Sequence, residues 1–479
     1  MSIYEALVRY GEKEIYPMHM PGHKRRDTFS MCNPYAIDVT EVEGTDNLHH
    51  PEGIIRELMN QMREIYHTRE SYVLVNGSTC GILTAISTCC HRGDVIIMDR
   101  NCHRSVYHAV YLLDLKPVYL YRKQDRETGI ALELEAGQIR EALERNSASC
   151  VVVTSPTYEG IVSDIGAIAG EVHRKEIPLI VDEAHGAHFA WEERMPEAAM
   201  ELGADIVVES LHKTLPAFTQ TGVLHVCSER VKKELVERYL DIYETSSPSY
   251  ILLAGVGQCI DWMLRNGREA FTKYWEHLEE FEERAKRWKT LKLWRNPAKE
   301  PSKLVIRTEE KTLDGHELAE ILRNQYAVEI EMATSGYILA MTSVCDSQEG
   351  FWRLADALEK LDKEQGKCNP MKKSSSEKMF SGENDNSGCG SASFPVRMGI
   401  YDAMNFPYRE IPVQESVGEI SAEYVFFYPP GIPFLVPGEE ITESAALRIV
   451  AAGEGKRRLF GLTDKEGKKI RVADIRKGE

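Results

Sequence analysis

The sequence predicts an α/β protein with a large domain built on a mostly parallel seven-stranded sheet, a smaller α/β domain and a C-terminal α+β domain. Three observations support this prediction. Seven short apolar runs rich in β-branched residues recur through residues 71–226. Spacers of helix length separate several of these runs. The runs lack the alternation of a half-exposed strand, so their strands are expected to be buried on both faces in a sheet that helices cover.

The predicted helices and strands can be given by residue range. Residues 228–290 have the 3.6-residue periodicity of helices, strand candidates follow at 303–307 and 337–343, and a helix is expected to end near Leu361. The seven strands of the large sheet are predicted at SYVLV (71–75), DVIIM (94–98), PVYLY (117–121), CVVVT (150–154), IPLIV (177–181), DIVV (205–208) and GVLHV (222–226).

Composition divides the chain into five parts. A stretch rich in Lys, Ser, Gly and Asn at 364–393 predicts a flexible linker, and paired prolines and glycines beyond it predict short strands joined by turns. The predicted parts are an N-terminal segment (1–70), a large cofactor-binding domain (71–260), a small α/β domain (261–363), the linker (364–393) and a C-terminal domain (394–479).

Bulk properties exclude several classes of protein. A net charge of −17 over 479 residues argues against binding to nucleic acid or to an anionic membrane surface. The charged N-terminus does not resemble a signal peptide, no apolar run is long enough to cross a bilayer, and the 11 cysteines form no CxxC pair. We therefore expect a cytoplasmic protein with reduced cysteines and without a metal site.

Polar residues directly follow five of the predicted strands. They are NGST (76–79), RNCH (100–103), SPTY (155–158), DEAH (182–185) and SLHK (210–213). Because ligands of open α/β sheets bind at the carboxyl ends of the strands, these five segments predict one shared site.

Lys213 and Asp182 are the central pair of this predicted site. A lysine at one strand end and an acid at another, each near a histidine, supply what pyridoxal 5'-phosphate requires: an amine for the Schiff base and a carboxylate for the ring nitrogen. Taken singly, Lys213 could be a solvated strand end and Asp182 a helix cap. DEAH also occurs in nucleotide-driven helicases, but the phosphate loop GxxxxGK[ST] is absent from this sequence.

The other predicted contacts each have a simpler alternative. Ser78 and Thr79 could hold a phosphate at a helix N-terminus or only cap that helix. His103 could stack on a flat ring or pack in the core, and His212 could bind phosphate, pass a proton or lie at the surface. Ser155 and Thr157 could bind the phenolic oxygen or the phosphate of the cofactor, although SPT is also common in turns.

Long motifs resemble the bacterial Orn/Lys/Arg decarboxylases of the aspartate-aminotransferase fold type. The resemblance extends from about residue 17 to about residue 440 and rests on HMPGHK (19–24), TEVEGTDNLHHPEG (40–53), NGST (76–79), RNCHRSV (100–106), TSPTYEG (154–160), VDEAHGAHF (181–189), SLHKTLPAFTQ (210–220), TSSPSY (245–250) and YPPGIPFLVPGE (428–439). HMPGHK lies close to the N-terminus, which is similar to the compact members that lack a receiver-like N-terminal domain. Cys80, Gly81 and Ile82 depart from the family pattern after NGST, which puts fine details of that helix start in doubt.

The resemblance implies a function and a set of site residues. It implies pyridoxal-phosphate-dependent decarboxylation of a basic amino acid, arginine before lysine or ornithine, to the amine and carbon dioxide, in polyamine biosynthesis and by a homodimer or larger homo-oligomer. The roles implied are Lys213 for the Schiff base, Asp182 for the ring nitrogen, His103 for stacking, His185 beside the ring, and Ser78, Thr79, Ser210 and His212 for the phosphate, with Lys213 or His212 returning a proton to the substrate.

Three alternatives remain open at this stage. Another lyase or an aminotransferase of the same fold would share Lys213 and Asp182, and a non-catalytic regulator would need a DNA-binding feature that the sequence lacks. The acids Glu41, Glu43 and Asp46 are consistent with a cationic substrate and equally with a solvated loop.

Overall fold

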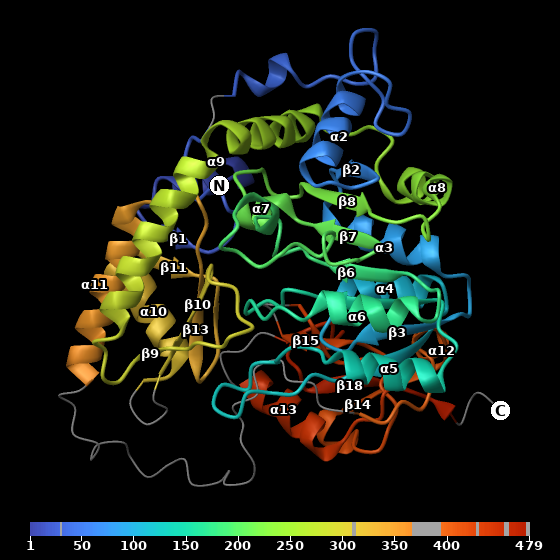
Figure 1. Ribbon diagram of the computed structural model, residues 1–479. Coiled ribbons are helices and arrows are strands. Elements are labelled where there is room, and N and C mark those ends of the chain that lie inside the picture. Colours follow the sequence, from blue (N-terminus) through green and yellow to red (C-terminus); the bar gives the residue numbers. More distant parts are fainter. Residues whose placement is uncertain (29–30, 309–312, 366–393, 428–430, 455–458, 476–479) are drawn as a thin grey trace.

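The computed structural model describes residues 1–28, 31–308, 313–365, 394–427, 431–454 and 459–475. A seven-stranded sheet forms the centre of the large domain, in the order β2-β8-β7-β6-β5-β3-β4 (Figure 1). Its strands are β2 (Glu70–Leu74), β3 (Val95–Asp99), β4 (Lys116–Leu120), β5 (Cys150–Thr154), β6 (Leu179–Asp182), β7 (Ile206–Glu209) and β8 (Gly222–Val226).

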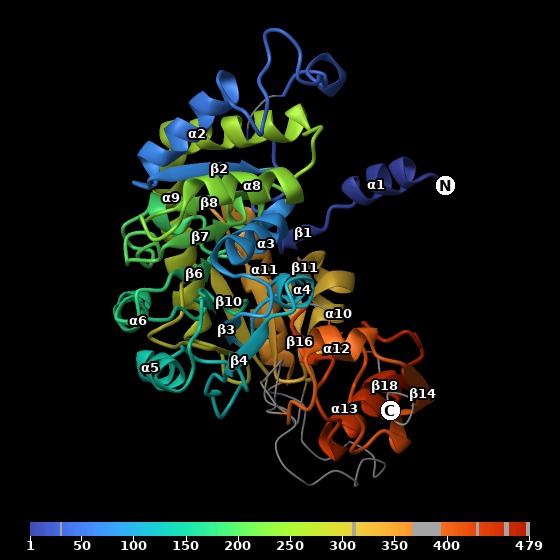
Figure 2. The same cartoon turned by 90° about the vertical axis from the view of Figure 1, so that its right-hand side faces the viewer.

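All seven predicted strands are present, and the predicted mostly parallel sheet is confirmed. Only β8 is antiparallel to its neighbours, β2 and β7. The strands are buried because helices cover both faces (Figures 1 and 2): α5 (Ala136–Arg145) and α6 (Ile165–His173) on one side, α3 (Gly77–Cys89) and α4 (Arg104–Leu112) on the other. The central strands are fully buried, as residues such as Val152, Ile180 and Val207 show.

The predicted helical region is two helices, α8 (Lys233–Tyr243) and α9 (Tyr250–Ala285), separated by the TSSPSY turn. Ser249 caps α9, because its side chain accepts a hydrogen bond from the amide of Leu252. The 36-residue α9 leads from the large sheet to the smaller domain, so the domain boundary predicted at residue 260 falls within it.

The smaller domain contains a four-stranded antiparallel sheet, in the order β12-β13-β10-β9, beside two helices. The elements are β9 (Lys292–Leu293), β10 (Lys303–Arg307), α10 (Gly315–Tyr326), β12 (Met332–Ala333), β13 (Tyr337–Met341) and α11 (Gln348–Gln365). The last helix therefore continues past Leu361, and residues 366–393 of the predicted linker lie outside the described residues.

The N-terminal segment is shared between the two domains. It contains α1 (Ile3–Gly11), β1 (Tyr16–Met18), the short helix η1 (Pro34–Ala36) and α2 (Ile54–Ile65). Strand β1 pairs in parallel with β11 (Val328–Ile330) of the smaller domain. The sequence alone gave no sign of this pairing, which joins residues more than 300 positions apart.

The C-terminal domain combines two small sheets, β14–β18 and β16-β15-β17, with a helix and has its own hydrophobic core. Its elements are α12 (Ile400–Asn405), β14 (Tyr408–Pro412), η3 (Val413–Glu415), β15 (Val425–Phe427), β16 (Pro433–Leu435), α13 (Glu443–Glu454), β17 (Leu459–Phe460) and β18 (Lys469–Ala473). The buried side chain of Arg100, just after β3, holds this domain, because it forms an ion pair of 3.1 Å with Glu439 and donates a hydrogen bond of 2.7 Å to the carbonyl of Pro433.

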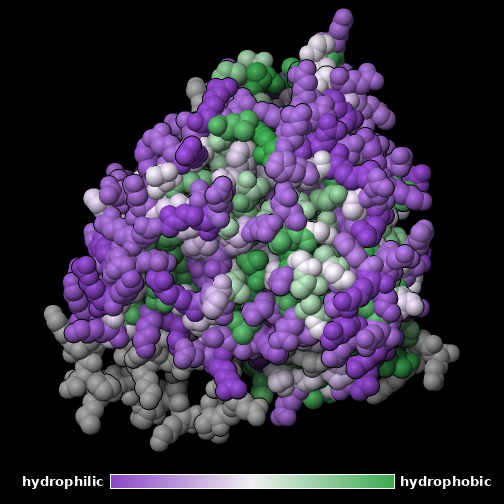
Figure 3. Space-filling view, viewed as in Figure 1, coloured by the Kyte–Doolittle hydropathy of each residue, from purple (hydrophilic) through white to green (hydrophobic). Residues whose placement is uncertain are grey.

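The surface includes a mainly hydrophilic face and a helix with exposed apolar side chains. The face shown in Figure 3 is mainly hydrophilic, with hydrophobic residues in small separate groups. Helix α1 instead projects away from the body (Figure 2) and leaves Ile3, Tyr4, Leu7 and Val8 exposed. Among the described residues, no helix is both long enough and apolar enough to cross a membrane.

Candidate active site

Lys213 lies on α7 (Leu211–Thr214), the single helical turn that follows β7. Its Nζ is 3.1 Å from Nε2 of His185, which lies in the loop after β6. Strands β6 and β7 are adjacent and parallel, so their carboxyl ends bring the DEAH and SLHK segments together as predicted. The ring of Tyr158, from the loop after β5, meets the ring of His185 edge-on, with 5.0 Å between the ring centroids.

Burial determines the protonation of these groups. Desolvation lowers the pKa of Lys213, and the nearby Asp182 and Glu331 partly oppose this effect. Desolvation raises the pKa of Asp182, and the charge of Lys213 opposes that shift. The pKa of the buried His185 is lowered, first by desolvation and then by Lys213. The amine of Lys213 therefore loses its proton more easily than an exposed lysine, which favours its action as a nucleophile.

The start of α3 has the features of a phosphate site. Its first residues are Gly77, Ser78 and Thr79, and the side chain of the N-cap residue, Asn76, makes no capping hydrogen bond. The first amides of a helix have no partner within the helix and attract anions. Ser210 reaches the same place, because its hydroxyl donates a hydrogen bond of 2.9 Å to that of Ser78.

Ser78 and Thr79 lie inside α3 rather than at its N-cap position. Capping therefore does not account for these two residues. Ser78 is half-buried beside Ser210, whereas the side chain of Thr79 is exposed.

His103, predicted to stack on the ring, and His212, predicted to bind the phosphate, are both half-buried. His103 caps α4, and its Nδ1 is 2.9 Å from the hydroxyl of Ser105. Desolvation and the charge of Lys213 lower the pKa of His103 to about 3. Nδ1 of His212 is 2.9 Å from the carbonyl oxygen of Thr221, and desolvation lowers its pKa to about 4. Both rings are consequently neutral at pH 7.

Ser155 and Thr157 support their own loop. The hydroxyl of Ser155 accepts a hydrogen bond from the amide of Ser163, and that of Thr157 accepts one from the amide of Ile161. Both side chains are buried. These bonds stabilise the turn after β5, and the predicted contacts of the two hydroxyls with the cofactor stay a prediction.

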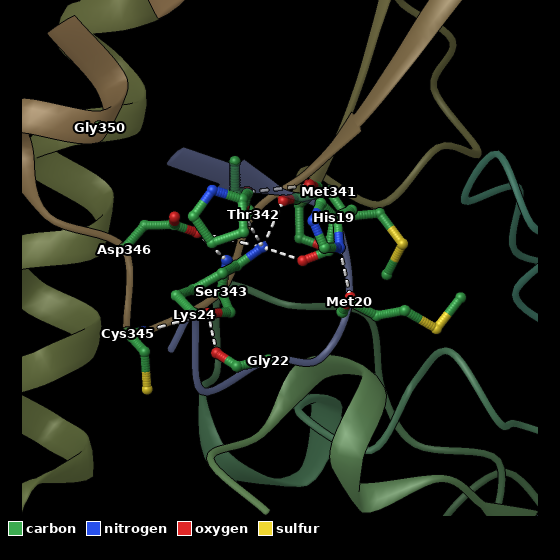
Figure 4. A network of polar contacts seen from close by, with 12 residues as sticks. His19, Met20, Gly22, Lys24, Met341, Thr342, Ser343, Cys345, Asp346 and Gly350 are labelled. Atoms are coloured by element: carbon green, nitrogen blue, oxygen red, sulfur yellow. Dashed lines mark hydrogen bonds and ion pairs between the residues drawn. The ribbon is translucent and has the colours of Figure 1, made fainter. Parts of the chain in front are cut away.

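The HMPGHK segment contacts both the turn that contains Lys213 and the smaller domain, and Figure 4 shows its contacts with residues 341–346. The amide of Gly22 donates a hydrogen bond of 2.7 Å to the carbonyl of His212, and a Cβ on Gly22 would lie 2.6 Å from the carbonyl oxygen of Leu215. The buried Lys24 fastens this segment to the smaller domain, because its Nζ donates to the carbonyl of Met341 at 2.7 Å and lies 3.7 Å from the carboxylate of Asp346. The motif therefore positions α7 through its backbone.

Two residues near Lys213 were missed by the sequence analysis. Glu331 accepts hydrogen bonds from the hydroxyl of Tyr158 and, at 3.0 Å, from the amide of Met20. Tyr158 stood in a quoted motif without a role. Glu331 gave no local signal, because it lies between two short strands far from the other site residues in sequence.

These residues fit pyridoxal 5'-phosphate. Lys213 supplies an amine of lowered pKa and Asp182 a buried carboxylate for the ring nitrogen. The start of α3 supplies amides for a phosphate. In addition, Nδ1 of His185 is buried without a hydrogen-bond partner in the described parts of the chain, as expected of a ring that lies against a bound group.

Comparison with known proteins identifies relatives over nearly the whole chain. The family model for the Orn/Lys/Arg decarboxylase major domain matches residues 2–329, and the model for the C-terminal domain of that family matches residues 400–463. A Bacillus subtilis (strain 168) protein named YaaO is 34% identical over 470 residues, 93% of each chain. The arginine decarboxylase of the same organism is 29% identical over 458 residues, 92% of this chain and 91% of that one.

A solved structure shows the same fold. The lysine decarboxylase LdcF of Francisella novicida superposes with a TM-score of 0.77 at 17% identity, over 98% of this chain and 83% of that one. The predicted fold type I of pyridoxal-phosphate enzymes is thereby confirmed.

Proposed function

This chain belongs to the Orn/Lys/Arg decarboxylase family, and we propose that it removes the α-carboxyl group of a cationic amino acid to give the amine and carbon dioxide. Pyridoxal 5'-phosphate is the cofactor that the family and the fold require. The observation that supports the proposal most is the contact of 3.1 Å between Lys213 and His185, at buried strand ends that also place Asp182.

Different residues of this chain would bind different parts of the cofactor. When bound, pyridoxal phosphate accepts the electron pair that the departing carbon dioxide leaves behind. Asp182 would hold the proton of the ring nitrogen, and Ser78, Ser210 and the first amides of α3 would hold the phosphate. His103 and His185 present neutral rings, which can pack against a flat aromatic group without adding positive charge.

Lys213 is the better candidate to return a proton to the α-carbon. The sequence left Lys213 and His212 as alternatives. His212 has Nδ1 engaged by the carbonyl of Thr221 and a pKa of about 4, so it holds no transferable proton at pH 7. Lys213 can hold the proton on Nζ, which lies 3.1 Å from Nε2 of His185.

Arginine is the proposed first substrate, followed by lysine and ornithine. Relatives that span nearly the whole chain are named arginine decarboxylase, whereas the Escherichia coli lysine decarboxylase matches 60% of this chain at 23% identity. The amine product would serve polyamine biosynthesis in the cytoplasm. We also propose a homodimer, in which a second copy covers the exposed apolar side chains of α1.

A substrate panel tests this proposal. The purified protein is given arginine, lysine, ornithine, glutamate and an aromatic amino acid under identical conditions, and amine and keto acid are both measured. Amine from a basic amino acid supports the proposal. Preference for glutamate or the aromatic substrate would refute the substrate class, and keto acid in place of amine would indicate an aminotransferase.

A further inference from the structure

Glu331 is a carboxylate held in a fixed place beside the proposed active site. It lies between β11 and β12 of the smaller domain. One carboxylate oxygen accepts the hydroxyl of Tyr158 from the large domain, and the other accepts the amide of Met20 from the N-terminal segment. Three parts of the chain thus meet at this side chain, which fixes its orientation before any substrate binds.

The electrostatic surroundings of Lys213 include two carboxylates. Asp182 and Glu331 are the acids whose charges act on the ammonium of Lys213. Asp182 is buried at the end of β6 and has the role of the ring-nitrogen acid. Glu331 is only half-buried, and its two oxygens accept from Tyr158 and Met20.

Other buried acids in this part of the molecule are already engaged. Glu300 accepts hydrogen bonds from the amide and hydroxyl of Ser302 and lies 3.8 Å from Lys303. Asp99 forms a buried ion pair of 2.7 Å with Arg122. Their free energy of burial depends on these partners, so neither is available for a substrate.

Two of the three acids that the sequence suggested for a cationic substrate, Asp46 and Glu43, have other surroundings. The carboxylate of Asp46 accepts backbone amides at the start of α2, those of Glu52, Gly53 and Ile55 among them. The side chain of Glu43 is exposed. Asp46 is therefore a helix-capping residue, whereas Glu41 of the same segment is half-buried, with Oε1 unpartnered among the described residues.

Two lysines contribute positive charge around His185. The charges of Lys213 and of the buried Lys303, which is paired with Glu300 at 3.8 Å, both lower the pKa of His185. A basic substrate brings a further positive charge into these surroundings. An oriented carboxylate with unused acceptor positions is needed to offset it, and a carboxylate has about four such positions, of which Glu331 uses two.

We propose that Glu331 binds the side-chain cation of the substrate and is the residue that restricts this site to basic amino acids. This inference rests on the proposed decarboxylase function. Glu331 forms charge-assisted hydrogen bonds to the guanidinium or ammonium group while Tyr158 and Met20 hold it in place. It contributes to binding and selectivity, and the reacting atoms remain with Lys213.

A comparison of arginine with citrulline as substrates separates the effect of the charge of Glu331 from the effect of its structural contacts. The two amino acids have nearly the same shape, but citrulline is neutral. In Glu331→Gln, we expect kcat/KM for arginine to fall roughly 100-fold, mainly through KM, because a hydrogen bond to a charged group is lost. Turnover of citrulline, where measurable, should change by less than about 3-fold, since an amide can still accept a hydrogen bond.

Two further variants serve as controls. Glu331→Asp keeps the charge and should recover part of the preference for arginine. Glu329→Gln removes a nearby acid that pairs with Arg323 at 2.9 Å and should leave the preference unchanged. Equal losses for arginine and citrulline in Glu331→Gln would show a merely structural role and overturn the proposal.

Binding of agmatine, measured by calorimetry on the holoenzyme, gives a second readout that does not depend on turnover. Glu331→Gln should weaken agmatine binding but not binding of butylamine, which lacks the distal cation. If the wild-type protein releases no amine from any basic amino acid, the proposed function fails. Equal agmatine affinities of wild type and variant would then overturn the role of Glu331 separately.

Discussion

Nζ of Lys213 and Nε2 of His185 lie 3.1 Å apart, on the segments that follow two adjacent parallel strands. Burial lowers the pKa of each group, so each loses its proton more easily than an exposed lysine or histidine. This contact brings the nucleophile and an imidazole ring to the same strand ends.

Lys213→Ala should abolish both turnover and the covalent attachment of the cofactor. Borohydride reduction of the wild-type protein, followed by peptide mapping, should place the cofactor on the peptide that contains Lys213. The variant should carry no reduced cofactor. Attachment at another lysine, or normal activity of the variant, would disprove the assignment.

Asp182→Asn should retain bound cofactor through the phosphate contacts but lower kcat by at least about 100-fold, because the proton of the ring nitrogen loses its charged partner. Cofactor content is measured by absorbance after release, and kcat by amine formation. A variant with near-normal kcat would remove Asp182 from this role.

Acid should destabilise the fold through His103 and His212. Their pKa values fall from 6.5 to about 3 and about 4 on folding. Between these values the unfolded chain binds protons that the folded chain does not, so the free energy of unfolding decreases as pH falls from about 7 towards 4. Urea midpoints at pH 7 and pH 5 should differ less for His212→Asn than for wild type.

The exposed His91 offers a matched control for this measurement, since its side chain is 96% accessible. His91→Asn should reproduce the pH dependence of the wild type. An unchanged pH dependence in His212→Asn would contradict the explanation.

Arg100→Met should destabilise the attachment of the C-terminal domain. The change leaves Glu439 buried without its ion partner, which typically costs about 3–5 kcal/mol. Urea unfolding measures this loss. Arg92→Met, at an exposed arginine, should cost less than about 1 kcal/mol, and adding Glu439→Leu to Arg100→Met should recover part of the stability. Equal effects of the two arginine changes would argue against Arg100 as the fastening residue.

Much of the large domain was predictable from sequence because its strands are buried on both faces. Runs such as CVVVT and IPLIV have no other stable environment than the interior of a covered parallel sheet. The pairing of β1 with β11 was not predictable, because its register depends on packing between segments that are distant in sequence. The helical periodicity of residues 228–290 did not show that this region forms two helices. The turn between α8 and α9 lies at TSSPSY, which the sequence analysis quoted only as a motif.

The candidate site, like the fold, was predictable from sequence only in part. Lys213, Asp182, His185 and Ser210 follow strands, so their meeting place follows from the topology of the sheet. Glu331 reaches the same place from a segment without a recognisable pattern, and the motif HMPGHK gave no role for the amide of Met20, so only the folded structure identifies their contact. The roles of the residues that bind substrate and cofactor remain predictions for the experiments above.

The most direct test of the central claim uses arginine labelled at its carboxyl carbon. The holoenzyme should release labelled carbon dioxide and agmatine in equal amounts, and Lys213→Ala should release neither. Labelled keto acid in place of carbon dioxide, or no product from arginine, lysine or ornithine, would contradict the proposed decarboxylation.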